Sequence, residues 1–261
     1  MDWNNELFDA GEQPLDRLVN GYSHTAVFRS MAFIGDSLSS GEFETRNEMG
    51  VPGYYDLFEY SWGQYIARHN GLKAYNFSRG GMTAGEYINS FAESRGFWDK
   101  EKACQAYVIA LGVNDILNAN MEIGCIQDVD TENCANNKPT FLGYYAAIVS
   151  RYKEISPDAK FFFVTFPHDV RGAESEQKMC KTIEALYALA DAFDNCYVID
   201  LYKYGPIYDE KFKEVFYLYG HMNPSGYILT AKLIDSYIDY IVRHNPADFK
   251  NAGFIGSNIQ Y

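Results

Sequence analysis

The stretch Gly35-Asp36-Ser37 follows a largely apolar segment, residues 27–34, and constrains the fold of this chain more than any other feature. An apolar run that stops at small polar residues is typical of a buried strand ending at the carboxyl edge of an α/β sheet, where such folds place their chemistry. Gly35 allows a sharp turn, and Asp36 or Ser37 can cap a following helix. We therefore interpret Ser37 as a candidate nucleophile, with a plain helix cap as the alternative.

Strands and helices alternate along the rest of the chain. The further strands are expected at 73–78, 106–112, 159–166 and 196–201, and the helices at 61–70, 84–94, 141–155, 174–193 and 225–243. This alternation predicts an α/β fold, a three-layer α/β/α sandwich around a flavodoxin-like five-stranded parallel sheet. One domain is expected over residues 1–261, with its core at about 28–243. Residues 1–26 are expected to wrap over it, and 42–60 to form a loop over the strand ends.

Two further strand ends carry groups that suit an oxyanion hole. Gly80-Gly81 lets the backbone approach a ligand, and the helix start that follows leaves N–H groups unpaired, so Gly81 is a candidate donor. A tight turn is the alternative, and the glycine patterns of phosphate-binding loops are missing. Asn114, just past the strand 106–112, is a second candidate donor unless its amide only bonds its own turn.

One histidine, His221, stands in a loop before the last long helix, where it can reach the same sheet edge. His168 follows the strand 159–166 and is also expected to face this edge. No acidic residue or serine stands beside His24, His69 or His244 at a motif spacing, so we interpret these three as packing or surface residues.

Composition excludes several classes of function. The 261 residues carry a formal net charge of −13, which argues against nucleic acid or an anionic membrane as a partner. The sequence shows no signal peptide and no membrane-spanning run, which predicts a cytoplasmic protein unless a signal has been removed. The five cysteines lack metal-binding spacing and are expected to be buried free thiols. A disulfide between Cys125 and Cys134 is the alternative.

Four segments together resemble the sequence blocks of the GDSL, or SGNH, hydrolase superfamily. They are Phe33-Ile34-Gly35-Asp36-Ser37-Leu38-Ser39-Ser40-Gly41, Asn76-Phe77-Ser78-Arg79-Gly80-Gly81-Met82-Thr83, Gly112-Val113-Asn114-Asp115 and His221-Met222-Asn223-Pro224-Ser225-Gly226-Tyr227. Each block alone is a weak signal, but their order and their positions at strand ends make the resemblance specific over about residues 28–243.

The resemblance implies a serine esterase or acylhydrolase that needs no cofactor and no metal. Ser37 would be the nucleophile and His221 the general base, and the oxyanion would be held by Ser37, Gly81 and Asn114. The substrate is expected to be a small-molecule or oligosaccharide ester, with a short acyl group on a carbohydrate favoured, and oligomeric state is not predicted.

The possible substrate-binding residues are His168, Trp62 and Arg79. The aromatic residues that suit a sugar-facing wall together with Trp62 are Tyr54, Tyr55, Phe58 and Tyr60. A lipase, lysophospholipase or thioesterase, a non-catalytic binding module and a flavin-binding protein are the alternatives.

The chain departs from the family pattern at one position. An Asp usually precedes the catalytic His by three residues, but Leu218 stands there. Because such an Asp orients the imidazole, a substitute is expected. We predict that the main-chain carbonyl of Leu218 or Tyr219 orients His221. A carboxylate from a nearby loop is the alternative, and the candidates are Asp169, Asp209, Glu210 and Glu214.

Overall fold

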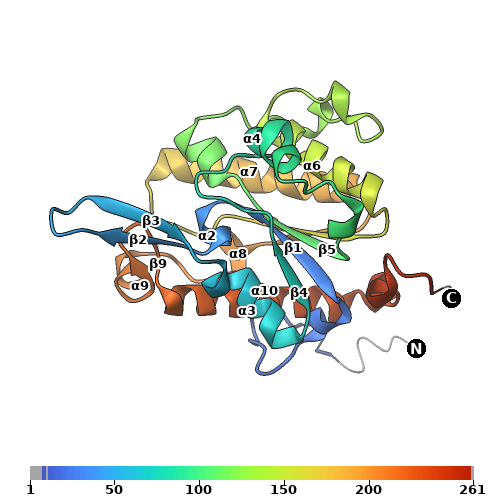
Figure 1. Cartoon of the computed structure of the whole chain (residues 1–261), viewed down its shortest axis with the longest axis horizontal. Helices are drawn as coiled ribbons and strands as arrows, with labels where there is room; N and C mark the ends of the chain where they lie inside the picture. Colours follow the sequence, from blue (N-terminus) through green and yellow to red (C-terminus); the bar gives the residue numbers. More distant parts are fainter. Residues whose placement is uncertain (1–7, 10, 260–261) are drawn as a thin grey trace.

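The computed structural model, which describes residues 8, 9 and 11–259, is built around a five-stranded parallel sheet in the order β4-β1-β5-β6-β7 (Figure 1). The strands are β1 Ser30–Gly35, β4 Lys73–Asn76, β5 Ala106–Ala110, β6 Lys160–Val164 and β7 Cys196–Ile199. All neighbouring strands are parallel, and β1, the first strand in the sequence, lies inside the sheet between β4 and β5. This is the predicted flavodoxin-like arrangement, and the fold class is confirmed.

Apolar runs rather than alternating patterns mark the inner strands because helices cover both faces of the sheet. Every residue of β6 is buried. Its side chains alternate between two cores: Phe161 and Phe163 belong to one, and Phe162 and Val164 to the other. Strand geometry points successive side chains to opposite faces, so a strand buried on both faces reads as a continuous apolar run.

The helices α3 Trp62–Asn70 and α10 Pro224–His244 cover one face of the sheet, and α6 Phe141–Ile155 and α7 Ala173–Ala192 cover the other (Figure 1). The shorter helices are α2 Ser37–Ser40, α4 Ala84–Glu86, α5 Ala92–Ser94, α8 Leu201–Tyr204, α9 Glu210–Phe216 and α11 Pro246–Phe249. Single π turns lie at η3 Tyr87–Phe91 and η5 Val113–Asn118. Short 3-10 turns are η1 His24–Val27, η2 Phe58–Tyr60, η4 Lys100–Lys102, η6 Ile126–Asp128, η7 Cys134–Asn136 and η8 Ala252–Phe254.

Two antiparallel hairpins lie beyond the carboxyl edge of the sheet. The segment predicted as a loop at 42–60 contains β2 Glu42–Arg46 paired with β3 Pro52–Asp56, and β8 Tyr217–Leu218 pairs with β9 His221–Met222. The turn between β2 and β3 is held by the Asn47 side chain, which accepts hydrogen bonds from the N–H groups of Met49 and Val51. In Figure 1 the β2–β3 hairpin projects from the sheet edge and passes over β9.

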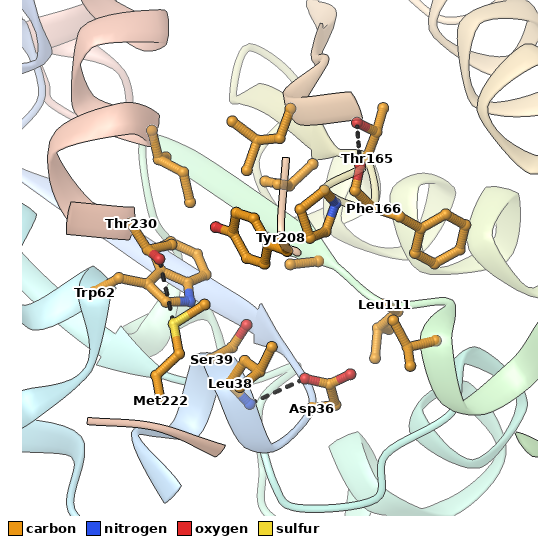
Figure 2. Close-up of a pocket in the computed structure, with 16 residues that line it drawn as sticks. Asp36, Leu38, Ser39, Trp62, Leu111, Thr165, Phe166, Tyr208, Met222 and Thr230 are labelled. Carbon is orange, nitrogen blue, oxygen red and sulfur yellow. Dashed lines mark hydrogen bonds between the residues drawn. The ribbon is translucent and has the colours of Figure 1, made fainter. Parts of the chain in front are cut away.

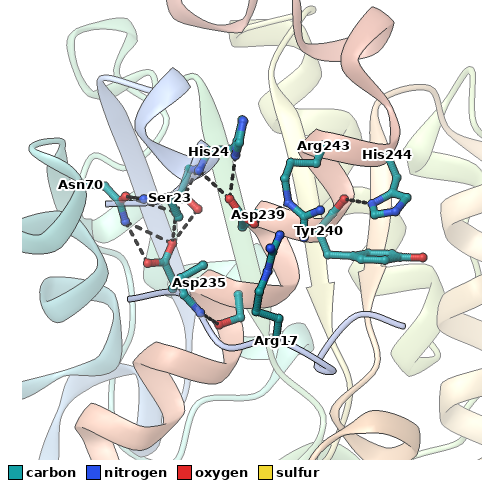
Figure 3. A network of polar contacts seen from close by, with 12 residues as sticks. Arg17, Ser23, His24, Asn70, Asp235, Asp239, Tyr240, Arg243 and His244 are labelled. Atoms are coloured by element: carbon teal, nitrogen blue, oxygen red, sulfur yellow. Dashed lines mark hydrogen bonds and ion pairs between the residues drawn. The ribbon is translucent and has the colours of Figure 1, made fainter. Parts of the chain in front are cut away.

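The described part of the N-terminal segment is tied to α10 by buried polar contacts (Figure 3). Asp235 accepts hydrogen bonds from the hydroxyls of Ser23 and Thr25, each at 2.6 Å. Nearby, the Arg243 guanidinium, whose side chain is only 3% exposed, bonds both carboxylate oxygens of Glu12 and one of Asp239. These contacts hold the N-terminal segment against α10, away from the carboxyl ends of the strands.

Replacing Arg243 with Met is expected to lower the free energy of unfolding by about 3 kcal/mol, because it removes the buried guanidinium that pairs with two largely buried carboxylates, Glu12 and Asp239. Urea denaturation at pH 7 measures the loss. Arg151→Met is the matched control: Arg151 pairs with Glu154 at the surface, where a pair contributes less than about 1 kcal/mol. Equal losses in the two variants would contradict the expectation.

All five cysteines are free, so the alternative disulfide between Cys125 and Cys134 is not formed. Of the five, Cys104 alone is buried as predicted. Cys125 is exposed, and Cys134, Cys180 and Cys196 are partly exposed. Within residues 8, 9 and 11–259, no helix combines the length and the apolar content that crossing a membrane requires.

Candidate active site

Ser37 is the first residue of α2, directly after β1. The Asp36 side chain caps this helix by accepting a hydrogen bond from the Leu38 N–H at 3.1 Å. The turn requires glycine at position 35, because a Cβ there would stand 2.2 Å from the Ser39 hydroxyl oxygen and 2.9 Å from the Ala110 carbonyl oxygen. As the first residue of a helix, Ser37 keeps a main-chain N–H that has no intrahelical acceptor.

Side chains from distant segments converge on a cleft of about 250 Å³ at the carboxyl edge of the sheet. Ser37, Asn114 and His221 all line it. Ser37 follows β1, Asn114 lies in the turn after β5, and His221 precedes α10. Each residue therefore comes from a different connection at the same edge. The cleft is also lined by Leu38, Val113, Leu117, Asn118, Phe166, Pro167, Asp169, Arg171, Met179, Tyr217 and Gly220, with Asp36 at its base.

The Asn114 amide has a defined orientation. Its carbonyl oxygen accepts a hydrogen bond from Asn118 Nδ2 at 2.7 Å, so its NH₂ group points the other way. That group donates to the Met82 carbonyl at 3.2 Å and, more weakly, to Asp36 Oδ2 at 3.4 Å. The π turn that begins at Val113 thereby brings a hydrogen-bond donor next to the start of α2.

Gly81 occupies a tight turn closed by a hydrogen bond from the Met82 N–H to the Arg79 carbonyl. Its φ of 72° lies in the left-handed region, which favours glycine. Gly81 is exposed and is not among the residues that line the cleft. The contact between Asn114 and Met82 ties this turn to the edge of the cleft.

His221 lies between two carboxylates of strand β2. Its Nε2 is 3.1 Å from Glu42 Oε1, and its Nδ1 is 3.5 Å from Glu44 Oε2. The Tyr54 ring stands edge-on to the imidazole, with 5.6 Å between the ring centroids. His221 Nδ1 is buried and has no hydrogen-bond partner among the described residues, so the prediction that a carbonyl of Leu218 or Tyr219 orients the ring is wrong. The Glu44 carboxylate is near Nδ1 at ion-pair distance only. In β8–β9, Leu218 pairs with His221 across the hairpin.

The four acids proposed as alternatives serve other partners or lie at the surface. Asp169 pairs with Arg171 and Lys213. Asp209 caps α9 by accepting from the Phe212 N–H, and Glu210 and Glu214 are exposed on that helix. Among the described residues, none of the four forms an ion pair with His221.

Charge in the site is set by burial and by these pairs. Burial raises the pKa of Asp36 to about 6, although the Leu38 N–H and His221 oppose the rise. Burial also raises the pKa of Glu42, and the neighbouring Asp56 and Glu44 carboxylates add to the effect. For Glu44, burial is outweighed by the Gly220 N–H, His221 and Arg46, so the pKa of this carboxyl lies below its usual range.

The three residues predicted as possible substrate contacts do not line the cleft. Trp62 is 2% exposed and packs edge-on against Phe33, and it lines a small apolar cavity beside the cleft. The His168 ring stacks on Tyr202, and Arg79 pairs with Glu86.

Sequence reasoning missed Glu42 and Glu44. Their alternation in Glu42-Phe43-Glu44 is the one signal that could have indicated a strand with two carboxylates on one face. In the described part of the chain, no group of three or more His, Cys, Asp or Glu side chains is arranged to hold a metal ion.

Comparisons with known proteins identify the family of the chain. The model of the GDSL-like Lipase/Acylhydrolase family matches residues 33–229, which include all four sequence blocks. No curated protein matches the chain.

Several solved structures share the fold at low sequence identity. A family two carbohydrate esterase from Clostridium thermocellum, in complex with cellohexaose, has a TM-score of 0.57 at 16% identity, over 89% of this chain and 67% of that chain. A putative lipolytic protein of the G-D-S-L family from Desulfitobacterium hafniense DCB-2 has a TM-score of 0.51 at 16% identity, over 80% and 99% of the two chains. The acetyl xylan esterase AlAXEase has a TM-score of 0.53 at 17% identity, again over 80% and 99%. With the family match over most of its length, the chain belongs to the GDSL-like lipase/acylhydrolase family and is a hydrolase that acts on ester bonds.

Proposed function

We propose that this enzyme is a serine esterase that removes short acyl groups, such as acetyl, from a carbohydrate. The observation that carries the proposal is the convergence of Ser37, Asn114 and His221 on one cleft from three separate connections of the sheet. A hydroxyl, an imidazole and an oriented amide donor are the groups that acyl transfer through a serine requires.

The mechanism uses side chains and main-chain groups of the cleft together with the Gly81 N–H in the neighbouring turn. His221 accepts the proton of the Ser37 hydroxyl while its oxygen attacks the ester carbonyl carbon. The negative charge that develops on the carbonyl oxygen is held by the N–H groups of Ser37 and Gly81 and by the Asn114 amide. His221 then protonates the leaving alcohol, and water releases the acyl group from Ser37 by the same steps.

An apolar cavity next to the cleft supports a short acyl group (Figure 2). It measures about 70 Å³ and shares Asp36, Leu38, Val113, Phe166 and Pro167 with the lining of the cleft. An engineered cavity of about 150 Å³ binds benzene, so this smaller one suits an acyl group of a few carbons better than a fatty chain. Trp62 and Tyr208 also line it (Figure 2).

The other side of the cleft supports a sugar as the alcohol part. Tyr54 is 54% exposed beside His221, and Tyr219 is 56% exposed. Aromatic faces with a polar tip suit the C–H and hydroxyl groups of a sugar ring. Glu42 and Glu44 place negative charge beside His221, which favours a neutral sugar over an anionic headgroup. The carbohydrate esterases with this fold are consistent with the proposal.

Hydrolysis of p-nitrophenyl acetate, butyrate, octanoate and palmitate tests acyl length. The acetate is expected to have the highest kcat/KM, and the octanoate a value at least tenfold lower, because its chain exceeds the cavity.

Release of acetate from acetylated xylo-oligosaccharides, with acetyl-CoA as the thioester comparison, tests the alcohol part. Tyr54→Ala is expected to raise KM for the oligosaccharide and leave that for p-nitrophenyl acetate unchanged. Equal or faster turnover of octanoate, or a preference for acetyl-CoA, would contradict the proposal.

A further inference from the structure

The catalytic constellation lacks the acid that usually precedes the histidine, yet His221 is not without a carboxylate. The hairpin β2–β3, which follows directly after the helix that begins with Ser37, passes over β9 and brings Glu44 to the Nδ1 side of the ring. Strands β2 and β9 are in contact along this crossing. The carboxylate thus reaches the histidine from the opposite end of the chain.

Glu44 is fixed before any substrate arrives. It is 4% exposed, and its Oε1 pairs with Arg46 Nη2 at 2.5 Å. Its Oε2, the oxygen nearest to His221, accepts a hydrogen bond from the Gly220 N–H at 2.9 Å. Two donors on a buried carboxylate keep it ionised and aimed, as is required of a group that orients a neighbouring imidazole.

Glu42 also touches the imidazole but is differently placed. It approaches Nε2, the nitrogen that remains to exchange a proton with serine once Nδ1 is held. Its other oxygen lies over the Gly80 main chain, 2.3 Å from where a Cβ of that residue would be. The described structure shows no hydrogen bond that fixes the Glu42 carboxylate. A group on the reacting nitrogen cannot hold the ring in the tautomer that accepts a proton there.

We propose that Glu44 is the positioning residue of His221, and that the β2–β3 hairpin supplies in this way the carboxylate missing at Leu218. The assignment rests on the proposed function, in which His221 is the general base. Glu44 accepts the Nδ1 proton, which leaves the Nε2 lone pair free for the Ser37 proton, and its charge stabilises the imidazolium that forms. The other ionisable groups that face the ring are Glu42, Asp36 and Tyr54.

Glu44→Gln is expected to lower kcat on p-nitrophenyl acetate by about 10² to 10³, with KM within about threefold of the wild-type value. The loss stays below that of a full triad Asp because Glu42 still places a charge beside the imidazole. Glu44→Asp, which withdraws the carboxylate by one methylene, is expected to restore part of kcat. A kcat of Glu44→Gln within threefold of wild type would overturn the proposal.

Two controls separate positioning of the histidine from support of the hairpin. Arg46→Met removes the cationic partner of Glu44 but leaves the Gly220 N–H to hold the carboxylate near His221, so kcat is expected to fall less than tenfold. Glu210→Gln makes the same chemical change at an exposed site on α9 and is expected to have no effect. If Arg46→Met lost as much kcat as Glu44→Gln, and both variants lost equal thermal stability, Glu44 would be a structural anchor and the proposal would be wrong.

An NMR readout does not depend on turnover. In protein labelled with ¹⁵N-histidine, neutral His221, assigned with the His221→Gln variant, is expected to carry its proton on Nδ1. Glu44→Gln is expected to abolish that preference. A proton on Nε2 in the wild type would overturn the proposal. If the wild type shows the Nδ1 proton but hydrolyses none of the esters, the pairing stands and the esterase assignment fails.

Discussion

Ser37→Ala is expected to lower kcat on p-nitrophenyl acetate by at least about 10⁴, to the level that binding and the oxyanion donors alone support. The reason is that the acyl-enzyme intermediate cannot form without the hydroxyl. The main chain at position 37 is kept, so the N–H at the start of α2 and the Asp36 cap should persist.

The measurement is steady-state hydrolysis together with labelling by a fluorophosphonate and mass mapping of the modified peptide. Labelling is expected at Ser37 in the wild type and absent in the variant. Ser39 is the matched control for labelling, and no label is expected on it. It is buried two residues further along the chain and lines the apolar cavity rather than the cleft. Label on another residue, or activity retained in Ser37→Ala, would show that a different nucleophile acts.

His221→Ala is expected to cause a loss of similar size, about 10⁴ or more in kcat, because the serine then lacks a base and the leaving alcohol lacks an acid. The double variant Ser37→Ala/His221→Ala is expected to be no worse than either single variant, since the two groups act as one unit. Additive losses would show that they do not.

A second histidine separates the general base from a residue at the edge of the site. His168 follows β6, but it stacks on Tyr202 and does not line the cleft. His168→Ala is therefore expected to lose less than tenfold in kcat. A loss equal to that of His221→Ala, with the fold intact by circular dichroism, would require His168 to act in the chemistry.

The sheet, and the carboxyl edge at which the site residues lie, could be predicted from the sequence because the sequence patterns that mark them are local. Buried strands such as β5 and β6 are continuous apolar runs, and the helix starts that follow them carry recognisable glycine, asparagine and serine residues. Parallel strands end at the same edge, so knowing where each strand stops is enough to bring Ser37 and Asn114 together. The right-handed chirality of the connections then favours the flavodoxin-like strand order over the alternatives.

The partner of His221 was decided by tertiary structure alone. Gly220 and Glu44, joined by a hydrogen bond, are 176 residues apart, and no periodicity relates positions at that separation. Whether residues 42–56 form a hairpin, and which surface it crosses, depends on packing against β9. Trp62 is buried for the same reason: its helical spacing is visible in the sequence, but only the contact with Phe33 decides that its ring faces the core instead of the cleft. The sequence thus determined which groups reach the sheet edge, and long-range packing determined which of them touch.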